Sequence, residues 1–193
     1  MGGHAQPLAF LAIGLGVAVL AGHPPKASDF GRYSGWPAIG IAGAVLAALL
    51  NGFGEEIGWR GFALPAFQRR VGAMRAALIV AAFWALWHLP YFLLLSSYRG
   101  FGPFTLVGFS IGIASGSVVL TWLYYRSGQS ILAVAVWHAT YNMATAGSSA
   151  TIAAVVSALV IAQAIVLIRM HHDARQHGQR GVLGPPQEIR PTY

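Results

Sequence analysis

Residues 36–60 read WPAIGIAGAVLAALLNGFGEEIGWR, an apolar run that ends in two adjacent glutamates. The apolar part, residues 36–53, approaches the roughly 20 residues with which a helix crosses a hydrocarbon core about 30 Å thick. Glu55 and Glu56 follow it, and Arg60 lies four positions later. Ionisable side chains inside a bilayer are costly and usually belong to a functional site. This stretch therefore predicts both a membrane span and a centre of chemistry.

Five further apolar runs extend this prediction to the whole chain: 7–21, 76–95, 104–125, 131–146 and 151–170. Hydrophobic residues make up 56% of the 193 residues and charged residues only 9%. Only helices and closed barrels satisfy the backbone in lipid, and these runs are too long for barrel strands. We expect an all-α, polytopic helical membrane protein with about six transmembrane helices. Residues 1–170 would form one membrane-embedded domain, and residues 171–193 a flexible cytoplasmic tail.

The distribution of positive charge predicts the orientation. A net charge of +7 would suggest a nucleic-acid partner in a soluble protein, but here the positive-inside rule accounts for it, and we expect no nucleic acid. Threading six spans alternately leaves Lys26, Arg32 and Arg99 on one side. Both termini are therefore expected in the cytoplasm. The opposite, cytoplasmic side would carry Arg69, Arg70, Arg75, Arg126, Arg169, Arg175, Arg180 and Arg190.

Prolines and glycines predict where the helices bend and pack. Pro65 should break or bend the second helix, and Pro90 should kink the final part of the third, because proline disrupts helical hydrogen bonding. Gly108, Gly112 and Gly116 recur every fourth residue in the fourth helix. Such a stripe of small residues lets a neighbouring helix approach closely, so we interpret it as a packing seam.

The two glutamates should have different roles. On a helix, positions four apart share a face, whereas neighbours diverge by about 100°. Glu56 can therefore pair with Arg60, while Glu55 points elsewhere with no partner on its own helix. A paired carboxylate holds structure together, and an unpaired one is available as a general base. We assign catalysis to Glu55 and scaffolding to Glu56 with Arg60; the alternative is a charge cluster at a helix end.

His88 lies within an apolar span, where its ring nitrogens need partners. The second and third helices form a hairpin that turns near Gly72, so Glu55 and His88 should reach similar depths. Trp84, four residues earlier, shares the face of His88 and could hold its ring. The alternative for His88 is a buried histidine bonded to a backbone carbonyl.

His138 and Asn142 are also four residues apart on one expected helix. Both side chains can present N–H donors, as an oxyanion hole requires. The alternative is an interhelical polar pair. Three polar motifs in three apolar helices favour a shared site.

Other protease signatures are missing. The chain has no cysteine, which excludes thiolate catalysis, and His88 is followed by Leu89 and Pro90 rather than by a zinc-protease motif. Ser115 with His138 is a poor match to a rhomboid-type dyad and leaves both glutamates unexplained. A proton-coupled transporter or a non-catalytic immunity or scaffold protein remains as an alternative.

The three motifs together resemble those of the CPBP intramembrane proteases, the type II CAAX prenyl endopeptidases and Abi-type bacteriocin-processing bacterial proteins. The resemblance rests on Glu55-Glu56-x-x-x-Arg60, an aromatic stretch ending in His88, and His138-x-x-x-Asn142. Trp84 stands where the family usually has phenylalanine.

This resemblance implies an intramembrane endopeptidase in a bacterial cell membrane that cleaves a peptide bond near the cytoplasmic face. Glu55 would activate a water also held by His88, and His138 with Asn142 would stabilise the oxyanion. Glu56 with Arg60 would hold the site together. The partners would be the lipid bilayer and a peptide or membrane-anchored protein substrate. We expect hydrolysis without a bound metal; the alternative is Zn²⁺ held by Glu55, His88 and His138.

The orientation can be tested by cysteine labelling, because the natural chain contains no cysteine. Single cysteines at Ser28 and Gly100 should react in intact cells with a thiol reagent that cannot cross the membrane. Cysteines at Gly72 and Ser127 should react only after the membrane is opened. Labelling of Gly72 or Ser127 in intact cells would reverse the orientation.

Overall fold

The computed structural model describes residues 6–24, 26, 40–146 and 150–185, and all regular structure within them is helical. A π-helical segment, η2, joins the second and third helices. The elements in chain order are α1 (Gln6–Leu20), α2 (Gly40–Glu56), η2 (Ile57–Ala63), α3 (Leu64–Val71), α4 (Ala73–Trp87), α5 (Leu89–Leu94), α6 (Ser96–Arg99), α7 (Pro103–Arg126), α8 (Ile131–Ala146) and α9 (Ala150–Gln176). The expected all-α fold is confirmed for this part of the chain.

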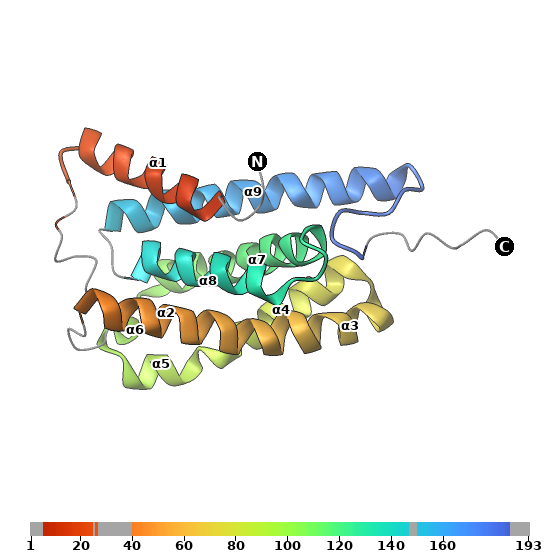
Figure 1. Ribbon diagram of the computed structural model, residues 1–193, viewed down its shortest axis with the longest axis horizontal. Coiled ribbons are helices and arrows are strands. Elements are labelled where there is room, and N and C mark those ends of the chain that lie inside the picture. The colour runs from red at the N-terminus through yellow and green to blue at the C-terminus, as the bar shows by residue number, and fades with distance from the viewer. Residues whose placement is uncertain (1–5, 25, 27–39, 147–149, 186–193) are drawn as a thin grey trace.

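Three helical segments are long and apolar enough to cross a membrane: α4 with α5 over Ala73–Leu94, α7, and α9. A shorter apolar helix covers Leu8–Leu20 within α1. The remaining long helices, α2 and α8, have 17 and 16 residues and run side by side (Figure 1). The protein is therefore an integral membrane protein, and the finer count of six crossings stays a prediction.

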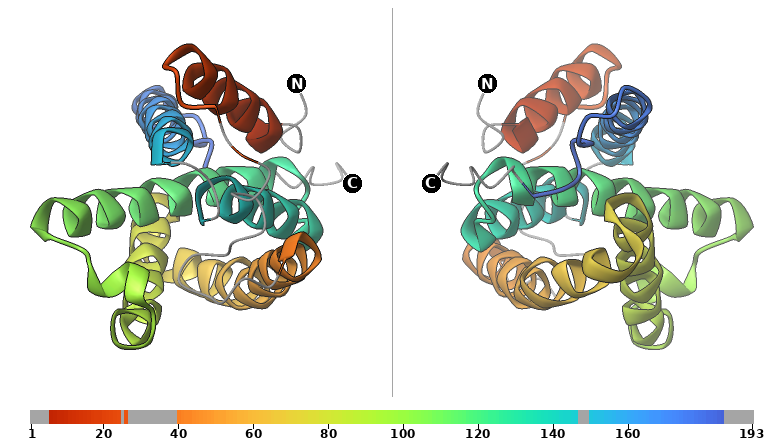
Figure 2. Two further views of the ribbon diagram at one scale, coloured as in Figure 1. Left: turned by 90° about the vertical axis from the view of Figure 1, so that its left-hand side faces the viewer. Right: turned by 90° about the vertical axis from the view of Figure 1, so that its right-hand side faces the viewer.

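The helices form a bundle with two different ends. One end, at the right of Figure 1, contains the Gly72 turn, the turn after α7 and the end of α9. The arginines expected in the cytoplasm border these turns, so we call it the arginine-rich end. At the opposite end α5, α6 and the first turns of α7 stand apart from the rest of the bundle (Figure 2).

Small residues bring α2 and α8 together along an extensive contact. Ala44 and Ala48 are buried against Ala139, and Gly52 continues their row one turn later. A Cβ atom at Gly52 would lie 2.7 Å from the backbone oxygen of Ala135, so only glycine fits there. This is the close helix approach that small residues permit.

The glycine stripe of α7 forms the expected packing seam only at its last member, Gly116. A Cβ atom at Gly108 or Gly112 would meet nothing within 4 Å, and one at Gly116 would touch only the Trp84 ring, at 3.6 Å. The spacing alone could not show whether the space beside these glycines is filled by another helix. The space is open beside Gly108 and Gly112, whereas Gly116 is buried against Trp84 of α4, and the tightest helix approach lies between α2 and α8 instead.

The two prolines act differently. Pro90 follows a real interruption, since α4 ends at Trp87 and α5 begins at Leu89, which confirms the expected kink. Pro65 breaks nothing: helical structure continues from residue 40 to residue 71. Pro65 lies in the first turn of α3, directly after η2, where a missing amide hydrogen is tolerated.

The C-terminal region differs from the expected tail in its first residues. Helix α9 continues to Gln176, beyond the expected boundary at residue 170. Leu183 is fully buried, and its carbonyl accepts a hydrogen bond from Gln68 Nε2 at 3.0 Å. Residues up to 185 are thus anchored to the bundle, while residues 186–193 lie outside the described part of the chain.

The α2–α8 seam predicts a stability difference between two neighbouring glycines. Gly52→Ala should lower the melting temperature in detergent, because overpacking a tight contact costs about 1–3 kcal/mol. Gly54→Ala, on the same helix, faces open space and should leave stability unchanged or slightly raise it through helix propensity. Equal melting temperatures for the two variants would contradict the seam.

Candidate active site

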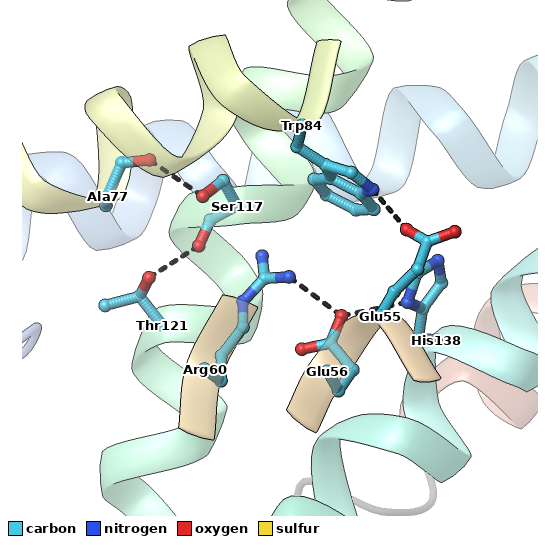
Figure 3. Close-up of polar contacts among 8 residues, drawn as sticks. All are labelled: Glu55, Glu56, Arg60, Ala77, Trp84, Ser117, Thr121 and His138. Carbon is cyan, nitrogen blue, oxygen red and sulfur yellow. Dashed lines mark hydrogen bonds and ion pairs between the residues drawn. The ribbon is translucent and has the colours of Figure 1, made fainter. Parts of the chain in front are cut away.

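Glu55 points from the end of α2 towards α4 (Figure 3). Its Oε2 atom accepts a hydrogen bond from the indole Nε1 of Trp84 at 2.5 Å. The carboxylate is half-buried and borders a cavity. A donor fixed to one carboxylate oxygen sets the orientation of the group and leaves the other oxygen to act.

Glu56 points away from Glu55 and is fully buried. Its Oε1 atom lies 2.8 Å from Arg60 Nη1 and 2.8 Å from His138 Nδ1. The pairing of Glu56 with Arg60 agrees with their spacing of four residues, whereas the contact with His138 joins α2 to α8 and was not expected. Charges this deep persist only when they are paired.

Arg60 is also fully buried, and its guanidinium carbon lies 4.9 Å from the centroid of the Trp84 ring. This cation–π contact stabilises the charge in apolar surroundings. Its Nε and Nη2 groups have no hydrogen-bond partner among the described residues. Arg60 therefore depends strongly on the Glu56 carboxylate and on the Trp84 ring.

Trp84 connects the buried Glu56–Arg60 pair with Glu55 and with the two histidines. Besides bonding Glu55 and covering Arg60, it meets the His138 ring edge-on, with centroids 5.2 Å apart. Helix α4 is held in place by a hydrogen bond of 2.8 Å from Ser117 Oγ on α7 to the Ala77 carbonyl (Figure 3). We expected Trp84 only to hold the His88 ring, and its role is wider.

His88 occupies the break between α4 and α5. Its Nδ1 atom lies 2.7 Å from the Trp84 carbonyl oxygen. A carbonyl oxygen can only accept a hydrogen bond, so Nδ1 carries the proton. In the neutral ring this leaves a lone pair on Nε2. The backbone contact matches the alternative considered for His88, yet the residue also borders the cavity with Glu55. One contact thus orients the ring and prepares its second nitrogen as an acceptor.

His138 has a comparable arrangement on α8. Because Nδ1 faces the Glu56 carboxylate, the neutral ring carries its proton there and has a lone pair on Nε2. The ring presents an N–H group at Nε2 only as an imidazolium. Asn142, one turn later, borders the same cavity, and no hydrogen bond occupies its side chain among the described residues.

The cavity has a volume of ≈ 690 Å³. Glu55, His88, His138 and Asn142 all border it, whereas Glu56 and Arg60 lie behind its wall. The structure therefore brings all six expected residues into one region, in two groups. The cavity extends from Glu55 towards the end of the bundle opposite the arginine-rich end, between α5, α7, α8 and the first half of α9.

Two features of the cavity were missed in the sequence. Asn51 borders it one turn before Glu55, and a polar residue on the same helical face was a signal that could have been used. The open glycines Gly108 and Gly112 form part of its wall. Their role depends on how α7 lies, which no spacing reveals.

Within the described residues, no three His, Asp or Glu side chains are grouped closely enough to ligate a metal ion. The Nε2 atoms of His88 and His138 are acceptors in the neutral rings, and one oxygen of Glu55 is bonded to Trp84. Metal-free hydrolysis stays a prediction.

Comparison with known proteins gives the family. The model of the family described as type II CAAX prenyl endopeptidase Rce1-like matches residues 36–144, more than half of the chain. The chain belongs to this family. The family is one of peptide-bond hydrolases of membranes, and the matched residues contain all six expected site residues. The resemblance seen in the sequence motifs is thus confirmed.

A curated relative agrees with this assignment. The CAAX prenyl protease 2 of Methanococcus maripaludis is 30% identical to the chain over 93 residues. The alignment covers 46% of this chain and 34% of that protein. The chain thus matches about a third of the relative's length.

The buried ion pair predicts the stability of one variant. Glu56→Gln leaves the Arg60 charge without its carboxylate, and breaking such a buried pair costs about 3–5 kcal/mol. Its melting temperature in detergent should fall well below that of the natural protein. Glu55→Gln is the matched control, because its amide oxygen can still accept the Trp84 hydrogen bond. Similar losses in both variants would contradict the division between the two glutamates.

Proposed function

We propose that the protein is an intramembrane endopeptidase in which Glu55 activates the attacking water. The observation that carries this proposal is the cavity shared by Glu55, His88, His138 and Asn142. A general base, a second water acceptor and groups able to face an oxyanion are the parts that peptide hydrolysis needs. Family membership supports the same activity.

In the proposed reaction, a water molecule donates hydrogen bonds to Glu55 and to Nε2 of His88. Glu55 takes a proton as the water oxygen attacks the carbonyl carbon of the scissile bond. The carbonyl oxygen becomes an oxyanion, which accepts hydrogen bonds from the Asn142 amide and from imidazolium His138. Glu55 then gives its proton to the leaving nitrogen, the C–N bond breaks, and a carboxyl and an amine terminus are released.

Glu56 and Arg60 support this reaction without touching the substrate. Glu56 accepts the Nδ1 proton of His138, which sets the orientation of the ring. Arg60 pairs with Glu56 and lies against the Trp84 ring, whose indole group orients Glu55. Buried positioning groups of this kind hold catalytic side chains in place before the substrate arrives.

The proposed topology has six crossings, with both termini in the cytoplasm of a bacterial cell membrane. We also propose that cleavage occurs near the cytoplasmic face. The cavity extends away from the arginine-rich end, so on this topology the substrate enters from the opposite half of the membrane. The cysteine labelling described above tests the orientation on which these proposals depend.

The proposed substrate is a peptide or a membrane-anchored protein with an apolar segment beside the scissile bond. Aromatic side chains form much of the cavity wall, including Tyr91, Tyr98 and Phe109. The relative's name, CAAX prenyl protease 2, describes a protease of prenylated proteins, and a lipid-modified substrate suits such a wall.

Loss of the base should abolish turnover. Cells that carry the natural protein should contain membrane peptides that are absent with Glu55→Gln, as measured by comparing their membrane peptidomes. The reason is that glutamine cannot accept the proton of water at neutral pH. Cells that carry Arg69→Gln, a change outside the cavity, are the control and should contain these peptides. An unchanged peptidome with correctly folded Glu55→Gln would show that Glu55 is not the base.

Metal-free hydrolysis has its own test. Purified protein should keep its activity after prolonged chelation and contain well under one zinc ion per chain by elemental analysis, because a glutamate base and a histidine-held water need no metal. Stoichiometric zinc, with activity lost on chelation and regained on zinc addition, would instead make His88 and His138 metal ligands.

A further inference from the structure

A separate cavity lies at the arginine-rich end of the bundle, away from the candidate active site. Its volume is ≈ 470 Å³, and its walls come from the start of α4, the end of α9 and residues 180–185. Arg75, Arg175 and Arg180 all border it. We propose that this cavity binds the phosphate group of an anionic phospholipid.

The charge of the cavity favours an anion. Three arginines from three segments of chain border it, and none of the described carboxylates does. Arg75 and Arg175 form no ion pair with a carboxylate among the described residues. Asp173 belongs to α9 but is not part of the wall. Guanidinium groups bind phosphate oxygens through paired, charge-assisted hydrogen bonds, so phosphate is the anion that such a wall fits best.

The start of α4 adds to the positive potential. The first helical hydrogen bond there runs from Ala76 N to the Gly72 carbonyl, and no side chain caps the helix. The preceding amide groups, in residues 73–75, therefore have no partner within the helix, and these residues form part of the wall. Amide groups at a helix N-terminus favour negative charge, in the same direction as the arginines.

The position of the cavity favours a lipid as the source of the phosphate. It lies where two candidate membrane spans end, at the first residues of Ala73–Leu94 and the last residues of Ala150–Gln176. Lipid phosphates occupy this level of a membrane. Basic pockets between transmembrane helices on the positively charged side bind anionic headgroups.

The wall formed by residues 180–185 is held in place before any ligand arrives. Leu183 is fully buried; its amide donates to His171 Nδ1 at 3.3 Å, and its carbonyl accepts from Gln68 at 3.0 Å. Tyr125 donates in turn to Gln68. A Cβ atom at Gly181 would lie 2.0 Å from His171 Nδ1, so the turn fits against the ring only with glycine there. A prepared site binds its ligand at a lower entropic cost.

Binding can be measured on the full chain in detergent micelles, by native mass spectrometry and by melting temperature, with phosphatidylglycerol, phosphatidylcholine or inorganic phosphate added. The natural protein should bind phosphatidylglycerol at least about tenfold more tightly than phosphatidylcholine. Arg75→Gln with Arg175→Gln should remove most of this preference. Arg69→Gln with Arg70→Gln is the matched control, since it removes the same charge at the same end but outside the cavity, and it should keep the preference.

Gly181→Ala tests the proposal without any change of charge. It displaces the His171 ring and the wall, so it should weaken phosphatidylglycerol binding while the protein stays folded, as judged by its melting temperature without lipid. Equal losses in the two arginine pairs, or no preference for phosphatidylglycerol, would overturn the proposal. Inorganic phosphate that binds as tightly as the lipid, with the same dependence on Arg75 and Arg175, would overturn the lipid as the source.

Discussion

The arrangement of the site depends on a single buried carboxylate oxygen. Glu56 Oε1 lies 2.8 Å from both Arg60 and His138, and therefore joins η2 and α8 to the end of α2. Neither the carboxylate nor the guanidinium group is exposed, so water does not compensate either charge. The three side chains can only be buried together, which makes their relative positions a condition of folding.

Trp84 connects this buried group of charges to the residues that border the cavity. The Arg60 charge lies against one face of the indole ring, and the indole N–H holds Glu55. The carbonyl of the same residue holds His88. Trp84 thus links the buried pair to Glu55 and His88, the two side chains proposed to hold the water. A phenylalanine in place of Trp84 would offer the ring but no N–H group, so the hydrogen bond to Glu55 requires the tryptophan.

Local patterns predicted much of this arrangement, and long-range geometry accounts for the rest. The apolar runs gave the helical fold, and the spacing of four residues gave the Glu56–Arg60 pair, because both depend only on helical periodicity. The bond between Trp84 and Glu55 could not be predicted, since it requires the rotation of α4 relative to α2. The open space beside Gly108 and Gly112 of α7 was not predicted for the same reason. The roles of Glu55, His88, His138 and Asn142 in the reaction stay predictions.

The contrast between Gly52 and the glycines of α7 has a consequence for how this protein can diverge. At Gly52 any side chain would collide with the backbone of α8. This contact joins α2, which carries Glu55, to α8, which carries His138. At Gly108 and Gly112 an added side chain meets only open cavity. Mutations can therefore reshape the α7 wall gradually, one methyl group at a time, without shifting the helices that hold the charged residues. The shape of the cavity can therefore change independently of the α2–α8 contact, which tolerates no added side chain at Gly52.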